Sequence, residues 1–211
     1  MPEIVVRFML FALIHSLLAT DAVKGRVCRL RTVTRLYRLG YNFLALGSFA
    51  WVLEALPGSP ILYSIPGYPA VILHSVQACA LILLCRCAAQ TGLGEFAGIS
   101  QMLTGKETAP QFTRSGCYRM VRHPQYTLAV IFLLAAPTVS LNYAFFTLLA
   151  ALYFALGGYI EESRLRGTFG DDYHRYQTEV PMFVPRWVGL RTRSQAPGKQ
   201  THQASGRSGP V

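Results

Sequence analysis

The stretch GCYRMVRHPQY, residues 116–126, places ionisable and aromatic side chains between two long apolar segments. Proline disfavours helical backbone in the residue before it and is well accepted in the first turn of a helix. We therefore expect a helix to begin at Pro124, with Arg122 and His123 just before its first turn. The N-terminus of a helix carries partial positive charge and free N–H groups. These residues consequently indicate a site for an anionic group, such as the carboxylate of a ligand.

Glu161 and Glu162 form a second polar group, at the end of the last long apolar segment. Adjacent carboxylates are disfavoured by the dipole at a helix C-terminus and are costly near hydrocarbon. We therefore expect cationic or hydroxyl groups to compensate them. Together with His123 and Tyr126 they could bind a ligand that carries a cation, a diol and a carboxylate. A simpler interpretation is equally open, in which these side chains are interfacial anchors and the glutamates pair with nearby arginines.

The composition shows what kind of protein must position these side chains. Of the 211 residues, 52% are hydrophobic and 14% are charged, whereas soluble domains carry about 25% charged residues. The net charge of +10 comes from arginines and lysines beside apolar runs, a pattern typical of membrane topology rather than of nucleic-acid binding. We therefore expect an all-α integral membrane protein that contacts membrane lipids and has no nucleic-acid partner.

A membrane-spanning helix needs about 20 mostly apolar residues, and five segments are candidates. They are Ile4–Thr20, Leu39–Leu56, Tyr68–Ala89, Tyr126–Ser140 and Asn142–Ile160. The last two are nearly continuous and predict a helical hairpin. Lysine and arginine concentrate after the first, third and fifth segments, so the positive-inside rule places the N-terminus outside and the C-terminus in the cytosol. This topology puts His123 and both glutamates at the same cytosolic end.

The segment after the fifth span is amphipathic. Gly170 followed by Asp171 fits a helix end and a new N-cap, and Tyr173, Tyr176 and Val180 share one face of the second helix. We expect this segment to pack at the cytosolic membrane surface. Residues 194–211 are rich in Gly, Ser, Gln and Pro without apolar periodicity, which predicts a disordered tail after a single domain of residues 1–193.

Cysteine and histidine residues leave weaker alternatives open. There are five cysteines, most of them in or beside apolar segments, which argues against a disulfide framework. Cys79, Cys85 and Cys87 in the third segment are typical of buried packing, with metal binding as the alternative. His15 and His74 could ligate a haem from facing helices, although the expected topology places them in opposite halves of the membrane.

The order of the motifs resembles the isoprenylcysteine carboxyl methyltransferase family, small integral-membrane enzymes that use S-adenosylmethionine. GCYRMVRHPQY is followed by the apolar hairpin and then by EESRL, FGDDYHRY and VPMFVP. The resemblance covers residues 90–187 and identifies them as the cofactor-binding core. It implies S-adenosylmethionine contacts for Gln101, Gln111, Phe112, Thr113, Tyr118, His123, Pro124, Gln125, Tyr126, Glu161 and Glu162.

Three departures from the family pattern bear on the methyl acceptor. Thr127 and Leu128 stand where the family has a small glycine soon after RHPxY, and Glu179 replaces a basic residue before VP. Enzymes that methylate a prenylcysteine carboxylate carry an arginine four positions before the first glutamate, and here that position is Gly157. Without this cation nothing obvious neutralises a carboxylate substrate. The glycine pattern is similar to the branch that includes bacterial methanethiol S-methyltransferases and the membrane protein nurim.

The resemblance therefore implies a methyltransferase in the cytosolic leaflet that transfers the methyl group of S-adenosylmethionine to a small or lipophilic acceptor, with a thiol favoured. Catalysis is expected to rest on orientation and desolvation, because a thiolate needs little help from a base. A prenylcysteine carboxylate is the alternative acceptor, and a non-catalytic nurim-like protein is the alternative class. The expected membrane is the bacterial inner membrane or, in a eukaryote, that of the endoplasmic reticulum or nuclear envelope.

Overall fold

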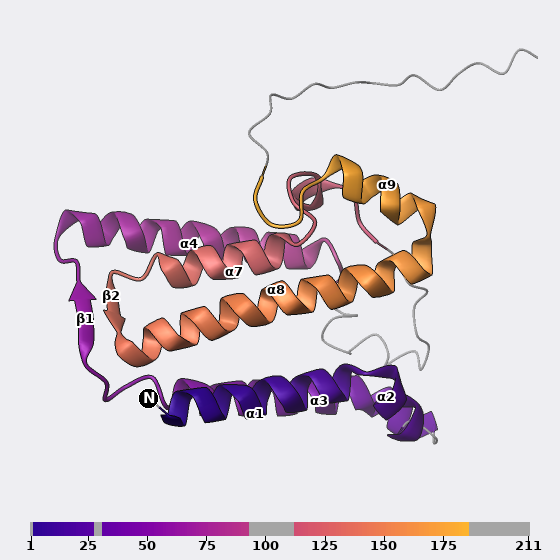
Figure 1. Ribbon diagram of the computed structural model, residues 1–211, viewed down its shortest axis with the longest axis horizontal. Helices are drawn as coiled ribbons and strands as arrows, with labels where there is room; N and C mark the ends of the chain where they lie inside the picture. The colour runs from indigo at the N-terminus through magenta and orange to yellow at the C-terminus, as the bar shows by residue number, and fades with distance from the viewer. Residues whose placement is uncertain (1, 28–30, 93–111, 186–211) are drawn as a thin grey trace, which may run out of the picture.

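The computed structural model describes residues 2–27, 31–92 and 112–185. The helices and strands follow one another as α1 (Pro2–Ala19), α2 (Asp21–Val27), α3 (Arg31–Leu53), β1 (Ile61–Ser64), α4 (Tyr68–Ala89), the short 3₁₀ helix η1 (Gly116–Arg119), α7 (Pro124–Leu134), β2 (Thr138–Ser140), α8 (Leu141–Phe169) and α9 (Asp171–Glu179). The long helices run back and forth along one axis (Figure 1). The expectation of a mainly helical protein is therefore confirmed.

The long helices pack in layers, with α8 in the middle (Figure 1). α4 and α7 lie side by side on one side of α8, and α1 and α3 pack together on the other. A core of buried apolar side chains joins α1, α3 and α8, and it includes Phe8, Val52, Phe146 and Ala150. The rings of Phe8 and Phe146 meet edge to face with centroids 5.9 Å apart. This core anchors α8, which in turn carries the two glutamates to one end of the bundle.

Each of the five predicted apolar segments lies largely within a helix, but several boundaries differ. α3 begins at Arg31 rather than Leu39, and α8 continues to Phe169 rather than ending at Ile160. The polar run EESRLR is made mostly of good helix formers, so the helix does not stop where the apolar pattern does. It ends at Gly170, whose φ of 54° is easily adopted only without a Cβ.

A two-stranded antiparallel sheet interrupts the expected all-α architecture. β1 and β2 pair with Ile61 opposite Ser140 and Ser64 opposite Thr138, and Ile65 N–H donates to the Pro137 carbonyl at 2.8 Å. Proline at 137 disfavours helix in the residue before it, so α7 ends at Leu134 instead of reaching Ser140. The prediction of helix through residues 135–140 is therefore wrong.

Three of the described helices, α1, α4 and α8, are long and apolar enough to cross a membrane, whereas α7 is a shorter apolar helix of 11 residues. The predicted count of five spans and its orientation stay predictions. Large apolar side chains such as Phe43, Ile72 and Leu156 face outward. So many exposed large apolar side chains are unusual for a water-soluble protein, and the bundle is therefore compatible with a membrane protein.

The two histidines considered as haem ligands have other partners. His15 Nδ1 lies 2.9 Å from the Tyr153 hydroxyl and Nε2 lies 2.7 Å from the Tyr41 hydroxyl. Both nitrogens are thus engaged between α1, α3 and α8, which leaves neither for an iron. His74 Nδ1 lies 3.0 Å from the Gln77 side chain on its own helix.

Candidate functional site

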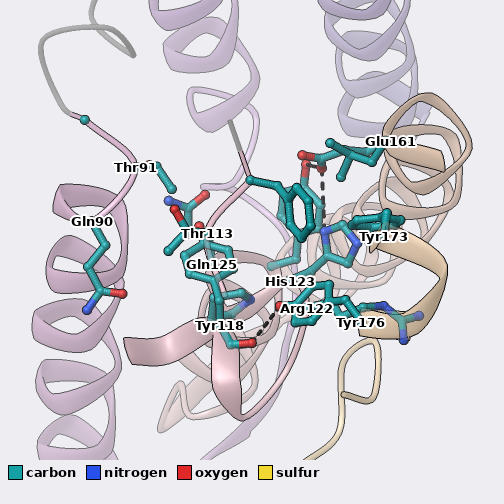
Figure 2. A pocket seen from close by; sticks show the side chains of 15 residues that line it. Gln90, Thr91, Thr113, Tyr118, Arg122, His123, Gln125, Glu161, Tyr173 and Tyr176 are labelled. Carbon is teal, nitrogen blue, oxygen red and sulfur yellow. Dashed lines mark hydrogen bonds and ion pairs between the residues drawn. The ribbon is translucent and has the colours of Figure 1, made fainter. Parts of the chain in front are cut away.

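A cavity of about 400 Å³ is lined by residues from the end of α4, the start of α7, the C-terminal part of α8 and α9 (Figure 2). Figure 1 shows that these parts of the helices lie at the same end of the bundle. The walls of the cavity come from residues 90–92, from residues between 112 and 126, from the C-terminal part of α8 and from α9. The lining residues are Gln90, Thr91, Gly92, Phe112, Thr113, Tyr118, Arg122, His123, Pro124, Gln125, Tyr126, Glu161, Leu165, Tyr173 and Tyr176.

Most of the residues singled out from the sequence meet at this cavity. The predicted contacts that line it are Phe112, Thr113, Tyr118, His123, Pro124, Gln125, Tyr126 and Glu161. Glu162 is the exception among the described residues, because it does not line the cavity and is buried behind His123. Gln101 and Gln111 lie outside the described residues.

His123 occupies the N-cap position of α7, as Pro124 predicts, and is only 6% exposed. Its backbone is fixed by a segment near the end of the described chain. Arg122 N–H donates to the Pro181 carbonyl at 2.9 Å, and His123 N–H donates to the Met182 carbonyl at 3.1 Å. The motifs RHPQY and VPMFVP are therefore joined through their backbones, and this pairing sets the position of the imidazole.

Gly158 on α8 makes room for that same segment. A Cβ at this position would lie 2.8 Å from the Met182 terminal methyl and 3.0 Å from the Phe183 ring. Contacts this short cannot form without displacing the neighbouring atoms. The neighbouring Gly157 is different, because a Cβ there would have no atom of the described chain within 4 Å. One glycine serves packing, and the other leaves space beside α8.

Glu161 faces the cavity and meets groups from α7. Its side chain is 48% exposed, and its Oε2 accepts a hydrogen bond of 3.0 Å from the Tyr126 hydroxyl. The same oxygen lies 3.5 Å from His123 Nδ1 (Figure 2). The imidazole and the Tyr126 ring are parallel, with centroids 5.3 Å apart. The hydroxyl group that was expected to compensate this carboxylate is therefore that of Tyr126.

Glu162 points into the protein and pairs with Arg122. Arg122 Nε donates to Oε1 at 2.6 Å, and Gln177 Nε2 donates to Oε2 at 2.7 Å. Arg122 also donates to the carbonyls of Gln177 and Val180. His123 Nε2 lies 3.3 Å from Glu162 Oε1. The buried carboxylate thus has the cationic partner that its position demands, and it ties α8 to Arg122, which precedes α7, and to Gln177 of α9.

Burial sets the protonation of the ring-bearing groups in the cavity wall. Burial lowers the pKa of His123 below its usual value, although the carboxylates of Glu161 and Glu162 act in the opposite direction. The imidazole is therefore neutral at pH 7. Burial, followed by the Glu161 charge, raises the pKa of Tyr118 to about 12, and burial raises that of Tyr176 to about 12. Both phenols are hydrogen-bond donors at neutral pH.

Residues of α9 were not among the individually predicted contacts, although α9 belongs to the predicted core of residues 90–187. Tyr173 and Tyr176 were expected to share one face, and they do, but that face is buried against the cavity rather than left for a membrane surface. The Phe112 ring lies 5.4 Å from the Tyr173 ring and 5.8 Å from the Tyr176 ring. The Tyr176 hydroxyl donates to the Tyr118 carbonyl at 2.6 Å. The sequence feature that could have indicated this role is the spacing of Tyr173 and Tyr176, which lie about one helical turn apart.

The end of α4 was also missed, and a disulfide holds it to the site. Cys87 is bonded to Cys117 of η1, and Gln90 Oε1 accepts a hydrogen bond of 3.3 Å from Cys117 N–H. The expectation that the cysteines pack without disulfides is wrong for this pair, which is separated by 30 positions. Cys79 and Cys85 are free and exposed rather than buried.

The chemistry of the lining suits an organic ligand with both polar and apolar parts. The N-terminus of α7 offers backbone N–H groups, Glu161 offers a negative charge and a hydrogen-bond acceptor, and aromatic rings supply flat apolar surface. No group of three or more acidic, histidine or cysteine side chains suited to a metal occurs within the described ranges. The walls are therefore suited to a small molecule that carries a cation, hydroxyls and a ring.

Three known proteins that are similar to this chain in sequence share the name methanethiol S-methyltransferase. The chain is 28% identical over 183 residues to methanethiol S-methyltransferase 1 of Bradyrhizobium diazoefficiens, covering 83% of this chain and 64% of that protein. It is 35% identical over 77 residues to methanethiol S-methyltransferase of a Pseudomonas species, covering 36% of this chain and 30% of that protein. For methanethiol S-methyltransferase 2 of B. diazoefficiens the identity is 27% over 189 residues, covering 86% of this chain and 72% of that protein.

These matches set the limits of the comparison. The chain spans less than two thirds of the length of several curated relatives that it matches. No family model matches the chain, and no solved structure matches it either. The names of these relatives agree with the resemblance to the methanethiol S-methyltransferase branch that the motifs indicated.

Proposed function

We propose that this protein is an integral-membrane, S-adenosylmethionine-dependent methyltransferase whose methyl acceptor is a small thiol. The observation that carries the proposal is the convergence of RHPQY, the first glutamate of EESRL and FGDDYHRY on one cavity at one end of an apolar bundle. The names of the relatives support a thiol acceptor for this chain.

The lining residues offer a partner for each part of S-adenosylmethionine. The α7 N-terminus, with the N–H groups of Gln125 and Tyr126, suits the donor carboxylate. Glu161 suits the ribose hydroxyls or the sulfonium. Rings such as Phe112 suit the adenine. The cavity volume of about 400 Å³ falls within the range of about 300–1,000 Å³ typical of small-molecule sites.

The remaining predicted contacts are proposed here with the same role. Thr113, Tyr118, His123 and Pro124 line the cavity and would contact the donor directly. Gln101 and Gln111 stay predictions. Glu162 would act indirectly, because its oxygens are already bound by Arg122 and Gln177.

Gly157 favours a thiol over a carboxylate as the acceptor. It precedes Glu161 by four residues and so lies on the same face of α8, where a Cβ would meet open space. An acceptor carboxylate at this depth would need a cation to neutralise it, and a glycine supplies none. A prenylcysteine carboxylate is therefore the less favoured acceptor, and a non-catalytic protein is the less favoured class.

We place the site at the cytosolic end of the bundle. From Leu141 to Glu161, α8 rises about 30 Å, which equals the thickness of a typical hydrocarbon core. Basic residues including Lys24, Arg26 and Arg86 belong to helix ends on the same side as the cavity. The positive-inside rule then gives a cytosolic C-terminus.

Binding of labelled S-adenosylmethionine to detergent-purified protein tests the proposal. We expect saturable binding by the wild type, weakened binding by Glu161→Ala, and unchanged binding by Glu179→Ala, a matched variant of an exposed glutamate on α9. Product analysis with methanethiol, a prenylcysteine and phosphatidylethanolamine then identifies the acceptor class. Absence of binding by the wild type would contradict an enzyme, and methylation of the prenylcysteine alone would contradict the thiol.

A further inference from the structure

We propose that His123 is a catalytic residue that takes the proton of the thiol at Nδ1, and that Glu162 is the positioning residue that holds the imidazole for this step. The inference rests on the proposed function, because it concerns a thiol acceptor in the same cavity. It replaces the expectation from sequence that no base assists the transfer.

The reaction requires that a proton leave the acceptor. The thiolate, not the thiol, is the sulfur nucleophile, and a side-chain thiol with a pKa of about 8.5 is only a few per cent ionised at pH 7. Simple alkyl thiols are no more acidic than this. A neutral base beside the sulfur would therefore increase the reactive fraction at the moment of transfer.

The geometry around His123 separates the two ring nitrogens. Nε2 is fully enclosed, lies 3.3 Å from Glu162 Oε1 and has no partner in full hydrogen-bond geometry among the described residues. Nδ1 lies 3.5 Å from Glu161, which lines the cavity. A proton on Nε2 is stabilised by the Glu162 carboxylate, and this tautomer leaves the lone pair of Nδ1 on the cavity side.

Glu162 is held rigidly enough to orient the ring. Arg122 binds one of its oxygens at 2.6 Å and Gln177 binds the other at 2.7 Å. The side chains of Arg122 and Glu162 are only 10% and 7% exposed. A histidine whose distal nitrogen faces a fixed carboxylate is a recurring arrangement in proton-accepting sites, because the carboxylate selects the tautomer and stabilises the imidazolium.

The charges that face His123 favour its protonation during the reaction. Arg122 is positive, Glu161 and Glu162 are carboxylates, and Tyr126 is a neutral phenol stacked on the ring. Together with a neutral imidazole, these groups carry a net charge of −1. Together with a protonated imidazole, they carry no net charge. The methyl donor loses its sulfonium charge in the transfer, so the imidazolium replaces the positive charge that disappears beside Glu161.

The atoms and electrons of the step balance. The S–H bond of the acceptor breaks, its electron pair stays on sulfur, and the proton binds Nδ1. The sulfur attacks the methyl carbon as the bond from that carbon to the donor sulfur breaks, and the electron pair of this bond goes to the departing thioether. The proton then leaves His123 for water past the half-exposed Glu161.

The other polar groups of the cavity are poorer bases. A carboxyl group has a pKa of about 4.3, whereas an imidazole has one of about 6.5, nearer to that of a thiol. The Tyr126 hydroxyl already donates its proton to Glu161. His123 is also the group whose resting form is neutral because burial lowers its pKa.

The decisive experiment compares two thiols in His123→Gln. The amide of this variant can still donate toward Glu162 but cannot take up a proton. His174→Gln, which changes an exposed histidine on α9, is the control. Binding of S-adenosylhomocysteine is measured first, and methyl transfer is then measured with an alkyl thiol and with an acidic aromatic thiol that is already ionised at neutral pH.

Because His123 also lines the donor site, we expect His123→Gln to bind S-adenosylhomocysteine more weakly than the wild type, so the rates with the two thiols are compared at saturating S-adenosylmethionine. The rate of the variant with the alkyl thiol should fall about 100-fold or more relative to its rate with the acidic thiol, because only the alkyl thiol needs a base. A rate with the alkyl thiol equal to that of the wild type, or equal losses with both thiols, would each overturn the role as a base. A wild type that methylates neither thiol would instead overturn the proposed function.

The wild type alone provides a second test should His123→Gln not fold. Because the neutral imidazole is the active form, kcat/KM for the alkyl thiol should rise with pH through the pKa of His123, which lies below its usual value of 6.5. An acidic thiol that stays ionised throughout this pH range should show no such rise. The same titration should appear in the nitrogen chemical shifts of labelled His123, and its absence from the kinetics of the alkyl thiol would contradict the proposal.

Discussion

Arg122 and Glu162, which are separated by 40 positions, form a buried ion pair with Nε 2.6 Å from Oε1. The pair joins the residue before His123 to the end of α8, and Gln177 of α9 completes it with a bond to the second carboxylate oxygen. Three motifs that are separate in the sequence therefore share one buried polar centre. This centre lies behind the cavity wall and fixes the residues that form it.

Breaking this ion pair should destabilise the protein. Removing one partner of a buried pair leaves an uncompensated charge and costs about 3–5 kcal/mol. We expect Glu162→Gln to lower the free energy of unfolding by that order, and Glu179→Gln to change it little. Thermal unfolding in detergent measures both. Equal stability of the two variants would show that the pair is not buried in this way.

Replacing Glu161, the neighbour of Glu162, should weaken binding of S-adenosylmethionine and leave the stability of the protein nearly unchanged. Its side chain is half exposed in the cavity and bonds the Tyr126 hydroxyl, so it contributes little to the fold. A hydrogen bond to a charged group is worth about 1.5–3 kcal/mol. We therefore expect Glu161→Gln to unfold like the wild type but to bind S-adenosylmethionine about tenfold or more weakly. Unchanged binding in a calorimetric titration would remove Glu161 from the donor site.

The two adjacent glycines of α8 provide a matched pair. Alanine gains the same helix propensity at both positions, so the difference between the variants reports packing alone. At Gly158 the new methyl meets Met182 and Phe183, whereas at Gly157 it meets open space. We expect Gly158→Ala to be less stable than Gly157→Ala by about 1–2 kcal/mol. Equal unfolding temperatures would contradict the packing of residues 181–184 against α8.

The Cys87–Cys117 disulfide should stabilise the cavity wall. A bridge that closes a loop of about 30 residues contributes roughly 3–4 kcal/mol by restricting the unfolded chain. We expect Cys117→Ser to lower the unfolding temperature under oxidising conditions by about as much as a reductant lowers that of the wild type. Under reducing conditions the variant should unfold at the same temperature as the wild type. Cys79→Ser, a change at a free and exposed cysteine, serves as the control. An identical response of both variants would argue against the bridge.

Local rules were sufficient for the parts of the fold that depend on neighbouring residues. Pro124 placed the start of α7 and the N-cap position of His123 correctly, because proline restricts the residue before it. Gly170 likewise ended α8, but the prediction of Asp171 as the N-cap of α9 is wrong, because Gly170 holds that position as well and Asp171 is the first residue of the helix. The apolar segments located the long helices α1, α4 and α8, because each contains a stretch of 18 residues with high mean hydropathy, which leaves few alternatives to a helix.

Long-range contacts account for what the sequence did not reveal. The pairing of β1 with β2 and the Cys87–Cys117 bond each join distant segments, and no local pattern specifies such partners. The two glutamates look equivalent in the sequence, yet only Glu161 faces the cavity. Their different roles follow from the rotation of α8 about its axis, since consecutive residues of a helix do not face the same side.

Transfer of a labelled methyl group tests the central claim most directly. Purified protein is incubated with S-adenosylmethionine that carries a deuterated methyl group and with methanethiol, and the volatile product is analysed by mass spectrometry. We predict dimethyl sulfide that contains one deuterated methyl group, formed by the wild type and by Glu179→Ala at similar rates and by Glu161→Ala much more slowly. Formation of no labelled thioether by a wild type that is folded and binds S-adenosylmethionine would contradict a thiol methyltransferase.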